Sequence, residues 1–197
     1  FYTFRKKKYE LVINLTEGDR AGFISLLTKA PIRLGYLNSN WFLRNAYTQL
    51  LPKQDFRHTI ETNLDPLKVL KIPIINKKVD IFWKDSDDKT INKELSNIDQ
   101  FIHIHPVSRW LFKCIEDKTM AKIIDFCEYE LGIRVVLTAD SNIYELGKIE
   151  GILNYCSSNP LNLSGKLTIK QTAALNKRAK LFIGVDTAIM HISASND

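Results

Sequence analysis

The chain has 197 residues, of which 45% are hydrophobic and 25% are charged, and its formal net charge is +6. This length and apolar content suffice for a packed core in one large domain or two small ones, which excludes a disordered chain. No apolar run approaches the roughly 18 to 20 residues that span a bilayer, and the N-terminus lacks the order of a signal peptide, so we expect a cytosolic protein.

The first part of the chain predicts a strand, a helix and a second strand, at residues 9–15, 19–30 and 31–37. An amphipathic helix is predicted over residues 58–71. From residue 85 to 97 the composition turns charged and polar, and we interpret residues 85–97 as a linker. The linker would join a first lobe at 1–84 to a second lobe at 98–197.

After residue 97 the chain alternates short apolar strands with amphipathic helices. Strands are expected at residues 99–106, 133–139, 162–165 and 181–185, and helices at 117–131, 142–156, 168–179 and after Thr187. This alternation is typical of a parallel sheet with helices on both faces, so the predicted fold class is α/β. In such sheets ligands bind beyond the carboxyl ends of the strands.

The last of these units, LFIGVDTAIMHISAS at residues 181–195, combines a strand, a tight turn and a helix. Its apolar run lacks strict alternation, which is typical of a strand buried on both faces of a parallel sheet. Asp186 and Thr187 are residue types that cap helix N-termini, where unpaired N–H groups and the helix dipole favour an anion. We therefore expect an anionic ligand at this turn.

Four stretches are expected to reach the same edge of the second sheet, because each follows a strand. They span residues 105–113, 138–145, 163–166 and 184–191. Together they supply cations, hydroxyls and carboxylates: Arg109, Lys113, Ser108, Thr187, Glu145 and Asp186. Cations and a helix N-terminus hold phosphates, whereas a carboxylate suits sugar hydroxyls. We therefore predict that Lys113 and the Asp186 turn meet over one strand edge and bind phosphate groups.

Three motifs carry a resemblance to a known family: YELVINLTEGDRAG, HPVSRWLFKCIED and NLSGKLTIKQTAALNKRAKLFIGVDTAIMHISAS. They resemble the ADP-heptose:lipopolysaccharide heptosyltransferases, glycosyltransferase family 9, most nearly the branch that adds the third inner-core heptose. The resemblance covers nearly the whole chain. It implies an inverting glycosyltransferase of the GT-B type, with two Rossmann-like lobes of parallel sheet, both truncated in this chain. The first lobe would bind the acceptor and the second the donor.

The resemblance also implies roles for particular residues. Lys113 matches the lysine that contacts the donor phosphates, and Ser108 and Arg109 complete that anion site. Glu145 matches the carboxylate that holds the adenosine ribose. The motif that frames the pyrophosphate, the heptose and the nucleotide pocket supplies Asp186, Thr187, Met190 and His191. Lys113 and Asp186 are expected to act in catalysis, and the other six residues in substrate binding.

Each of these residues also has a structural interpretation. Asp186 can act simply as a helix N-cap, and Lys113 as an exposed surface cation. Met190, at helical spacing, can belong to the core. Glu145, on the first turn of a helix, can complement the helix dipole.

Metal, disulfide and nucleic-acid sites are not expected. His103 and His105 share one face of a strand, but no third ligand follows at a matching spacing. An odd number of cysteines without a close pair favours reduced, structural thiols at Cys114, Cys127 and Cys156. No arginine-rich helix, zinc finger or aromatic RNP-like strand accompanies the positive charge.

The sequence departs from the family pattern at two places. In relatives the aspartate that deprotonates the acceptor hydroxyl lies ahead of residue 1, so the general base is not in this chain, and Asp19, in a different motif, is not assigned to that role. Where relatives favour Gly-Pro, this chain has Asp140 and Ser141, which alters the local backbone and affects the placement of Glu145. We expect the full-length protein to be active, and this fragment, without the N-terminal and C-terminal parts, to be inactive.

The implied reaction moves heptose from ADP-heptose to the inner core of lipopolysaccharide. The implied enzyme needs no metal or other cofactor, is a monomer, and works in peripheral contact with the cytoplasmic face of the inner membrane. Two alternatives stay open: another GT-B enzyme that uses a different nucleotide sugar, and an inactive fragment with only a binding role.

Overall fold

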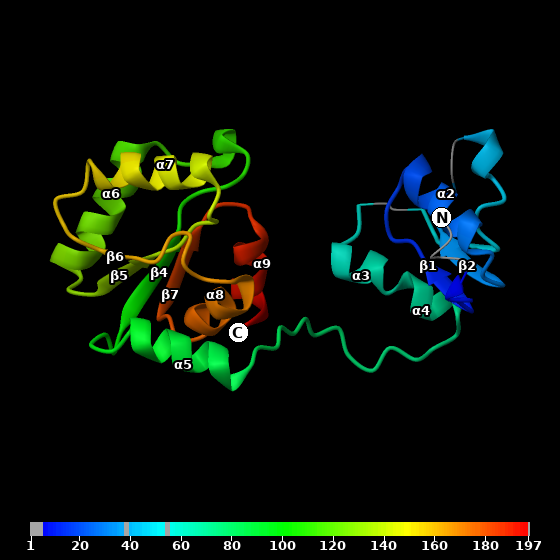
Figure 1. The fold of residues 1–197 in the computed structure, drawn as a ribbon, viewed down its shortest axis with the longest axis horizontal. Coiled ribbons are helices and arrows are strands. Elements are labelled where there is room, and N and C mark those ends of the chain that lie inside the picture. Colours follow the sequence, from blue (N-terminus) through cyan, green and yellow to red (C-terminus); the bar gives the residue numbers. More distant parts are fainter. Residues whose placement is uncertain (1–5, 38–39, 54–55, 197) are drawn as a thin grey trace. The chain divides into compact units, whose positions relative to one another are not determined.

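The computed structural model of the chain describes residues 6–37, 40–53 and 56–196. The chain divides into two compact units, Phe1–Lys77 and Lys78–Asp197, each with its own parallel sheet (Figure 1). Residues 1–5 of the predicted first lobe and residue 197 of the second lie outside the described part of the chain.

The first unit contains a three-stranded parallel sheet in the order β1-β2-β3. Its elements are β1 Leu11–Ile13, α2 Asp19–Thr28, β2 Ile32–Gly35, the 3-10 turn η1 Trp41–Leu43, β3 Gln49–Leu50, α3 Thr59–Asn63 and α4 Asp65–Val69. β1, α2 and β2 form the predicted strand–helix–strand unit. The helix predicted over residues 58–71 is divided at Leu64, because Pro66 in the first turn of α4 has no N–H to continue the hydrogen bonds of α3.

The core of this unit is small and lies between its sheet and α4. It consists of Leu34, Tyr36 and Leu51, with Val69 and Leu70 packed against them. The start of α4 is anchored by Asp65, which is 1% exposed and accepts hydrogen bonds from Arg57 at 2.7 Å and Lys68 at 2.9 Å. A charge this deeply buried is tolerated because it is paired.

The second unit contains a four-stranded parallel sheet in the order β6-β5-β4-β7. The strands are β4 Phe101–His105, β5 Arg134–Leu137, β6 Leu161–Asn162 and β7 Leu181–Gly184. The helices are α5 Asp85–Glu94, α6 Asp117–Asp125, α7 Ile143–Leu153, α8 Ile169–Asn176 and α9 Ala188–Ser195, with a 3-10 turn η2 Leu111–Lys113 and a π-helical turn η3 Phe126–Glu130 after α6. α6 and α7 cover one face of the sheet, and α5, α8 and α9 cover the other (Figure 1).

The central strand β4 contributes to a core on each face of this sheet. Ile102 and Ile104 pack with Ile124 of α6 on one side, whereas Phe101 packs with Leu175 of α8 on the other. All five residues of β4 are buried. A strand that is buried along its whole length is typical of a parallel sheet covered on both faces, which is the sheet that the sequence predicted.

The prediction that residues 85–97 form a linker was wrong. Asp85–Glu94 forms α5, which packs on α8 within the second unit. Ile91 is fully buried and Leu95, just after the helix, is 8% exposed, and both belong to the core that contains Phe101. The chain between α4 and α5 has no helix or strand over residues 72–84.

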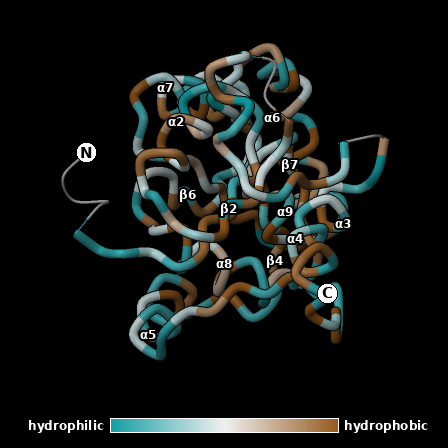
Figure 2. Tube along the Cα trace, turned by 90° about the vertical axis from the view of Figure 1, so that its right-hand side faces the viewer, coloured by the Kyte–Doolittle hydropathy of each residue, from teal (hydrophilic) through white to brown (hydrophobic). Residues whose placement is uncertain are grey.

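The hydrophilic composition of α5 explains this error. Much of α5 is hydrophilic (Figure 2). Nine of its ten residues are polar or charged, and only Ile91 within the helix is buried. The helix begins where the carboxylate of Asp87 accepts a 2.9 Å hydrogen bond from the backbone N–H of Lys84. Acidic residues in a first turn also interact favourably with the helix dipole. The sequence therefore contained a signal for the start of a helix, but its charged residues were interpreted as a solvated linker.

Two strand predictions also need correction. β7 lies at the edge of the described sheet and pairs with β4 alone. It is not buried on both faces, because none of its four residues is buried and Leu181 is 51% exposed. The strand predicted at residues 162–165 is confined to β6, because the chain turns at Gly165, whose φ of 72° ends the extended run.

Within the described residues, none of the helices combines the length and the apolar character that crossing a membrane requires.

Candidate functional site

A cavity of about 370 Å³ lies at the carboxyl ends of β4, β5 and β7 in the second unit. Its walls come from four segments: His105, Ser108, Arg109 and Trp110 after β4; Ala139, Asp140 and Glu145 after β5; Leu167, Ile169 and Thr172 at the start of α8; and Asp186, Thr187, Ala188 and Ile189 between β7 and α9. This is the edge at which parallel α/β sheets bind ligands.

Lys113 and Asp186 form an ion pair beside this cavity. The Lys113 Nζ lies 2.5 Å from the Asp186 Oδ2, although 73 positions separate the two residues in the sequence. The hydrogen bond and charge of Lys113 hold the pKa of Asp186 below its ordinary value. The prediction that these two residues meet at one strand edge is confirmed, whereas their binding of a diphosphate stays a prediction.

The N-cap position of α9 belongs to Thr187 and not to Asp186. Thr187 has extended backbone angles and makes no side-chain capping hydrogen bond. Its Oγ1 is buried without a hydrogen-bond partner in the described part of the chain. The first turn of α9 therefore presents free N–H groups and the positive end of the helix dipole to the cavity.

Glu145 is held in place by the loop that precedes α7. Its Oε2 accepts a 3.0 Å hydrogen bond from the backbone N–H of Asp140, and the residue is only 8% exposed. Asn142 caps α7 by accepting a hydrogen bond of 2.9 Å from the N–H of Tyr144. The backbone at Asp140 and Ser141, where a departure from the family pattern was expected to affect Glu145, thus places Glu145 at the cavity.

Ser108 and Arg109 also line the cavity. Ser108 is 4% exposed, and its Oγ accepts a 3.2 Å hydrogen bond from the N–H of Trp110. Arg109 is exposed, and its guanidinium carbon lies 6.0 Å from the centre of the Trp110 ring. Ser108 is therefore fixed in the turn, while Arg109 offers an exposed cation.

Met190 and His191 do not line this cavity, unlike the other members of their motif. Met190 is half-buried and His191 is exposed, one turn into α9. The charge of His191 contributes to the lowered pKa of Asp186, so it lies close enough to influence that carboxylate. The predicted stretch 163–166 is likewise not in the wall, which is formed by the start of α8 instead.

His103 and His105 are packed side by side against one hydroxyl. His103 Nε2 lies 2.7 Å and His105 Nδ1 2.9 Å from the Thr138 Oγ1. Burial lowers the pKa of His103 to about 3 and that of His105 to about 4, so both are neutral near pH 7. Over the part of the chain that the structure describes, no cluster of three His, Cys, Asp or Glu side chains could hold a metal ion.

The walls of the cavity include side chains that sequence reasoning did not assign to a ligand site: His105, Trp110, Leu167, Ile169 and Thr172. From the sequence, His105 was considered only as a possible metal ligand. Ile169 and Thr172 belong to a helix face, and a helical apolar pattern does not reveal which end of the helix borders a cavity.

The fold and site define a class. A parallel α/β sheet with a helix N-terminus, cations and carboxylates at its carboxyl edge is typical of Rossmann-like proteins that bind phosphate-bearing ligands. The chain belongs to glycosyltransferase family 9, the heptosyltransferase family, whose family model matches residues 1–197.

Two curated relatives support this assignment. Both are lipopolysaccharide heptosyltransferase 3, from Escherichia coli and from Escherichia coli strain K12, and they are 29% and 30% identical to this chain. The matches cover 97% and 98% of this chain. They cover 58% of each relative, so the chain spans a little over half of their length.

Solved structures confirm the predicted fold class, α/β of the GT-B type with parallel sheets. A glycosyltransferase family 9 protein from Veillonella parvula matches with a TM-score of 0.85 at 21% identity, covering 99% of this chain and 58% of that protein. The ADP-heptose lipopolysaccharide heptosyltransferase II of Escherichia coli matches with a TM-score of 0.73 at 15% identity, covering 99% of this chain and 62% of that protein.

Proposed function

We propose that the full-length protein transfers heptose from ADP-heptose to the inner core of lipopolysaccharide, with inversion at the anomeric carbon. Relatives named lipopolysaccharide heptosyltransferase 3 and ADP-heptose lipopolysaccharide heptosyltransferase II support this donor and this acceptor. The observation that carries the proposal is the ion pair of Lys113 with Asp186, because Asp186 lines one cavity together with the N-terminus of α9.

In this reaction the acceptor hydroxyl oxygen bonds to the anomeric carbon while the bond from that carbon to the ADP oxygen breaks. ADP leaves with the electron pair, so negative charge grows on its phosphate oxygens. Lys113, Arg109 and the first N–H groups of α9 would stabilise that charge, because fixed donors act most strongly where charge develops. No residue of this chain is assigned to accept the proton of the acceptor hydroxyl.

The other cavity residues would hold the donor. Glu145 would accept hydrogen bonds from the ribose hydroxyls, since a carboxylate suits such groups. Ser108 and Thr187 would add hydroxyl contacts, and Met190 and His191 would act from the flank of α9. The second unit would thus bind the donor, the first unit the acceptor, and contact with the cytoplasmic face of the inner membrane would bring the acceptor within reach.

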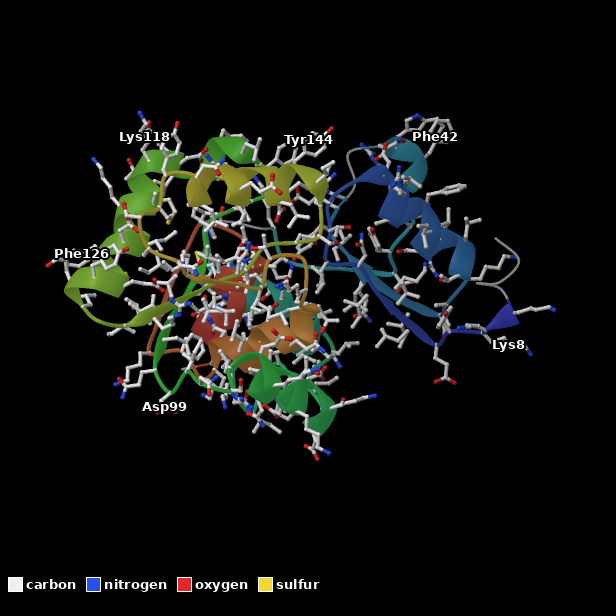
Figure 3. All side chains as sticks on the ribbon, turned by 60° about the vertical axis from the view of Figure 1, so that its left-hand side comes forward. Lys8, Phe42, Asp99, Lys118, Phe126 and Tyr144 are labelled. Carbon is white, nitrogen blue, oxygen red and sulfur yellow. The ribbon has the colours of Figure 1, made fainter. Side chains whose placement is uncertain are left out.

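Calorimetric titration with ADP tests the central assignment. Lys113→Ala is expected to raise the dissociation constant for ADP about tenfold, the effect of losing one charge-assisted hydrogen bond. Lys118→Ala is the matched control, because Lys118 is an exposed cation that points outward from α6 (Figure 3) and does not line the cavity. Equal dissociation constants for Lys113→Ala and the unaltered chain would remove Lys113 from the site.

A thermal-shift comparison of ADP with UDP tests the nucleotide. A ligand that binds only the folded chain raises its stability by mass action, so ADP is expected to raise the melting temperature and UDP to leave it unchanged. Stabilisation by UDP alone would replace the ADP-heptose donor with a uridine nucleotide sugar. Stabilisation by neither nucleotide would contradict a donor site in this unit.

A further inference from the structure

A row of hydrogen-bonded polar side chains crosses the second unit from the end of α9 to the cavity. We call this row the polar relay, and its members are Asn196, Asn176, His103, Thr138 and His105. The four inner members are buried, at 0 to 7% exposure. Successive contacts measure 3.1, 3.0, 2.7 and 2.9 Å from Asn196 to His105.

A backbone carbonyl fixes the direction of the hydrogen bonds at one end of the polar relay. Asn196 Nδ2 lies 3.3 Å from the carbonyl oxygen of Ala173, which can only accept, so this atom is a donor. Asn196 Nδ2 also donates to Asn176 Oδ1 at 3.1 Å, which identifies that atom as the oxygen. The Nδ2 of Asn176 therefore donates to His103 Nδ1.

The same reasoning passes from His103 to His105. A neutral imidazole that accepts at Nδ1 carries its hydrogen on Nε2, so His103 donates to Thr138 Oγ1. The Thr138 hydroxyl has no other side-chain or backbone acceptor among the residues described, and its hydrogen therefore goes to His105 Nδ1. His105 must then carry its own hydrogen on Nε2.

The Nε2 atom of His105 is available to a ligand. It has no partner in the described part of the protein, and it is not among the buried polar atoms that are sealed from solvent without a partner. His105 lines the cavity beside Asp186 and Ser108. The charged group that acts on it is Asp140, whose carboxylate opposes the lowering of the His105 pKa by burial.

We propose that His105 is a ligand-binding residue of the donor site, whose Nε2–H donates a hydrogen bond to an oxygen of the bound nucleoside diphosphate. Asn196, Asn176, His103 and Thr138 are positioning residues that select this tautomer. The inference deepens the proposed function, since it relies on a nucleoside diphosphate in this cavity. It also means that His105 cannot take a proton from the acceptor hydroxyl, because its lone pair is used at Nδ1.

Nitrogen-15 NMR of the histidine rings tests the tautomer without any ligand. At pH 7 both His103 and His105 are expected to be protonated on Nε2 and unprotonated on Nδ1, and the spectrum of His105→Gln identifies which signals belong to His105. Protonation of His105 on Nδ1 in the unaltered chain would overturn the inference. This outcome does not depend on whether ADP binds.

Asn176→Asp is expected to reverse the direction of the hydrogen bonds from His103 to His105, an effect that a merely structural role would not produce. A carboxylate accepts from His103 Nδ1, so His103 Nε2 becomes an acceptor, the Thr138 hydroxyl donates to it, and His105 then protonates at Nδ1. In this variant we expect the nitrogen signals of His105 to show Nδ1 protonated and Nε2 unprotonated. Asn154→Asp introduces the same charge on an exposed residue at the end of α7 and should leave them in place. Unchanged His105 signals in folded Asn176→Asp would contradict the polar relay.

Calorimetry with ADP tests the contact itself. His105→Phe removes the donor and is expected to raise the dissociation constant about five- to tenfold, whereas His105→Gln, which can place an N–H near Nε2, should lose less. If ADP binds the unaltered chain and both variants equally, the inference fails and the proposed function stands. If ADP does not bind the unaltered chain, the proposed function fails, and with it the assigned ligand of His105.

Discussion

The two neighbouring histidines of β4 give the folded chain a specific response to acid. Burial lowers the pKa of His103 to about 3 and that of His105 to about 4, from 6.5 in an unfolded chain. Between pH 6.5 and about 4 the unfolded chain takes up protons that the folded chain excludes, so the free energy of unfolding falls as the pH falls. Each histidine contributes up to about 1.4 kcal/mol per pH unit in this window.

Urea denaturation at several pH values between 7.5 and 5 checks this response. The free energy of unfolding should be nearly constant above pH 7 and decline below pH 6.5, with a slope that His105→Gln reduces by about half. The pH of these buffers lies above the ordinary pKa values of carboxylates, which separates the protonation of histidines from that of carboxylates. A slope unaffected by His105→Gln would mean that this imidazole is protonated in the folded chain.

At the scale of single residues, the sequence predicted what topology alone determines. Ser108, Glu145 and Asp186 reach one cavity because each follows a parallel strand. The role of His105 could not be predicted, because a histidine that ends an apolar strand has the same pattern whether its free nitrogen meets packed side chains or a cavity. Met190 and His191 were predicted from their motif, and the turn of α9 takes both away from the wall.

At the scale of elements, α8 begins with a reciprocal cap that also shapes the site. Thr168 Oγ1 accepts from the N–H of Gln171 at 3.3 Å, and Gln171 Oε1 accepts from the N–H of Thr168 at 2.9 Å. Ile169 and Thr172, in the first turn of this helix, line the cavity. The cap therefore positions two residues of the cavity wall as well as the start of α8.

Thr168→Ala is expected to lower the free energy of unfolding by about 1 kcal/mol, because one N–H of the first turn loses its acceptor. Thr168→Ser keeps the hydroxyl and should remain within a few tenths of a kcal/mol of the unaltered chain. Urea denaturation at pH 7.5 measures both. Equal losses in the two variants would show that the side-chain methyl, and not the hydroxyl cap, stabilises this turn.

α5 shows where prediction of the elements failed. A helix that contacts the core through Ile91 alone has too little apolar surface to be recognised by composition, and its contact partners lie on α8, far along the chain. Arg178 secures the contact, through Asp88 at 2.6 Å and Asn92 at 2.5 Å. Such long-range pairs have no signature in the local sequence.

At the scale of the whole molecule, the second unit is expected to include α5 as an essential part. Ile91 and Leu95 each contribute about 1.5 to 3 kcal/mol by burial, a large share of the roughly 5 to 15 kcal/mol that stabilises a domain. A chain of residues 78–197 should melt cooperatively and bind ADP as tightly as all 197 residues. A chain of 98–197 should melt without a sharp transition and bind the dye ANS at its exposed core.

Circular dichroism and dye fluorescence distinguish these two chains. The replacement of Ile91 by Asp in residues 78–197 provides an intermediate case, in which α5 is present but its core contact is lost. A cooperative transition for 98–197 at the same temperature as for 78–197 would indicate that α5 is dispensable.

The directional order within the polar relay restricts how this protein can change over evolution. Each member must donate a hydrogen bond to one neighbour and accept one from the other. A replacement that reverses the direction of one hydrogen bond must therefore be compensated by a second replacement that restores the direction before His105. Homologous sequences that keep a histidine at position 105 should therefore exchange the other members in compensating pairs. Asn196, Asn176, His103 and Thr138, none of which contacts the ligand in this proposal, would share one constraint because all four set the protonation of a single nitrogen of His105.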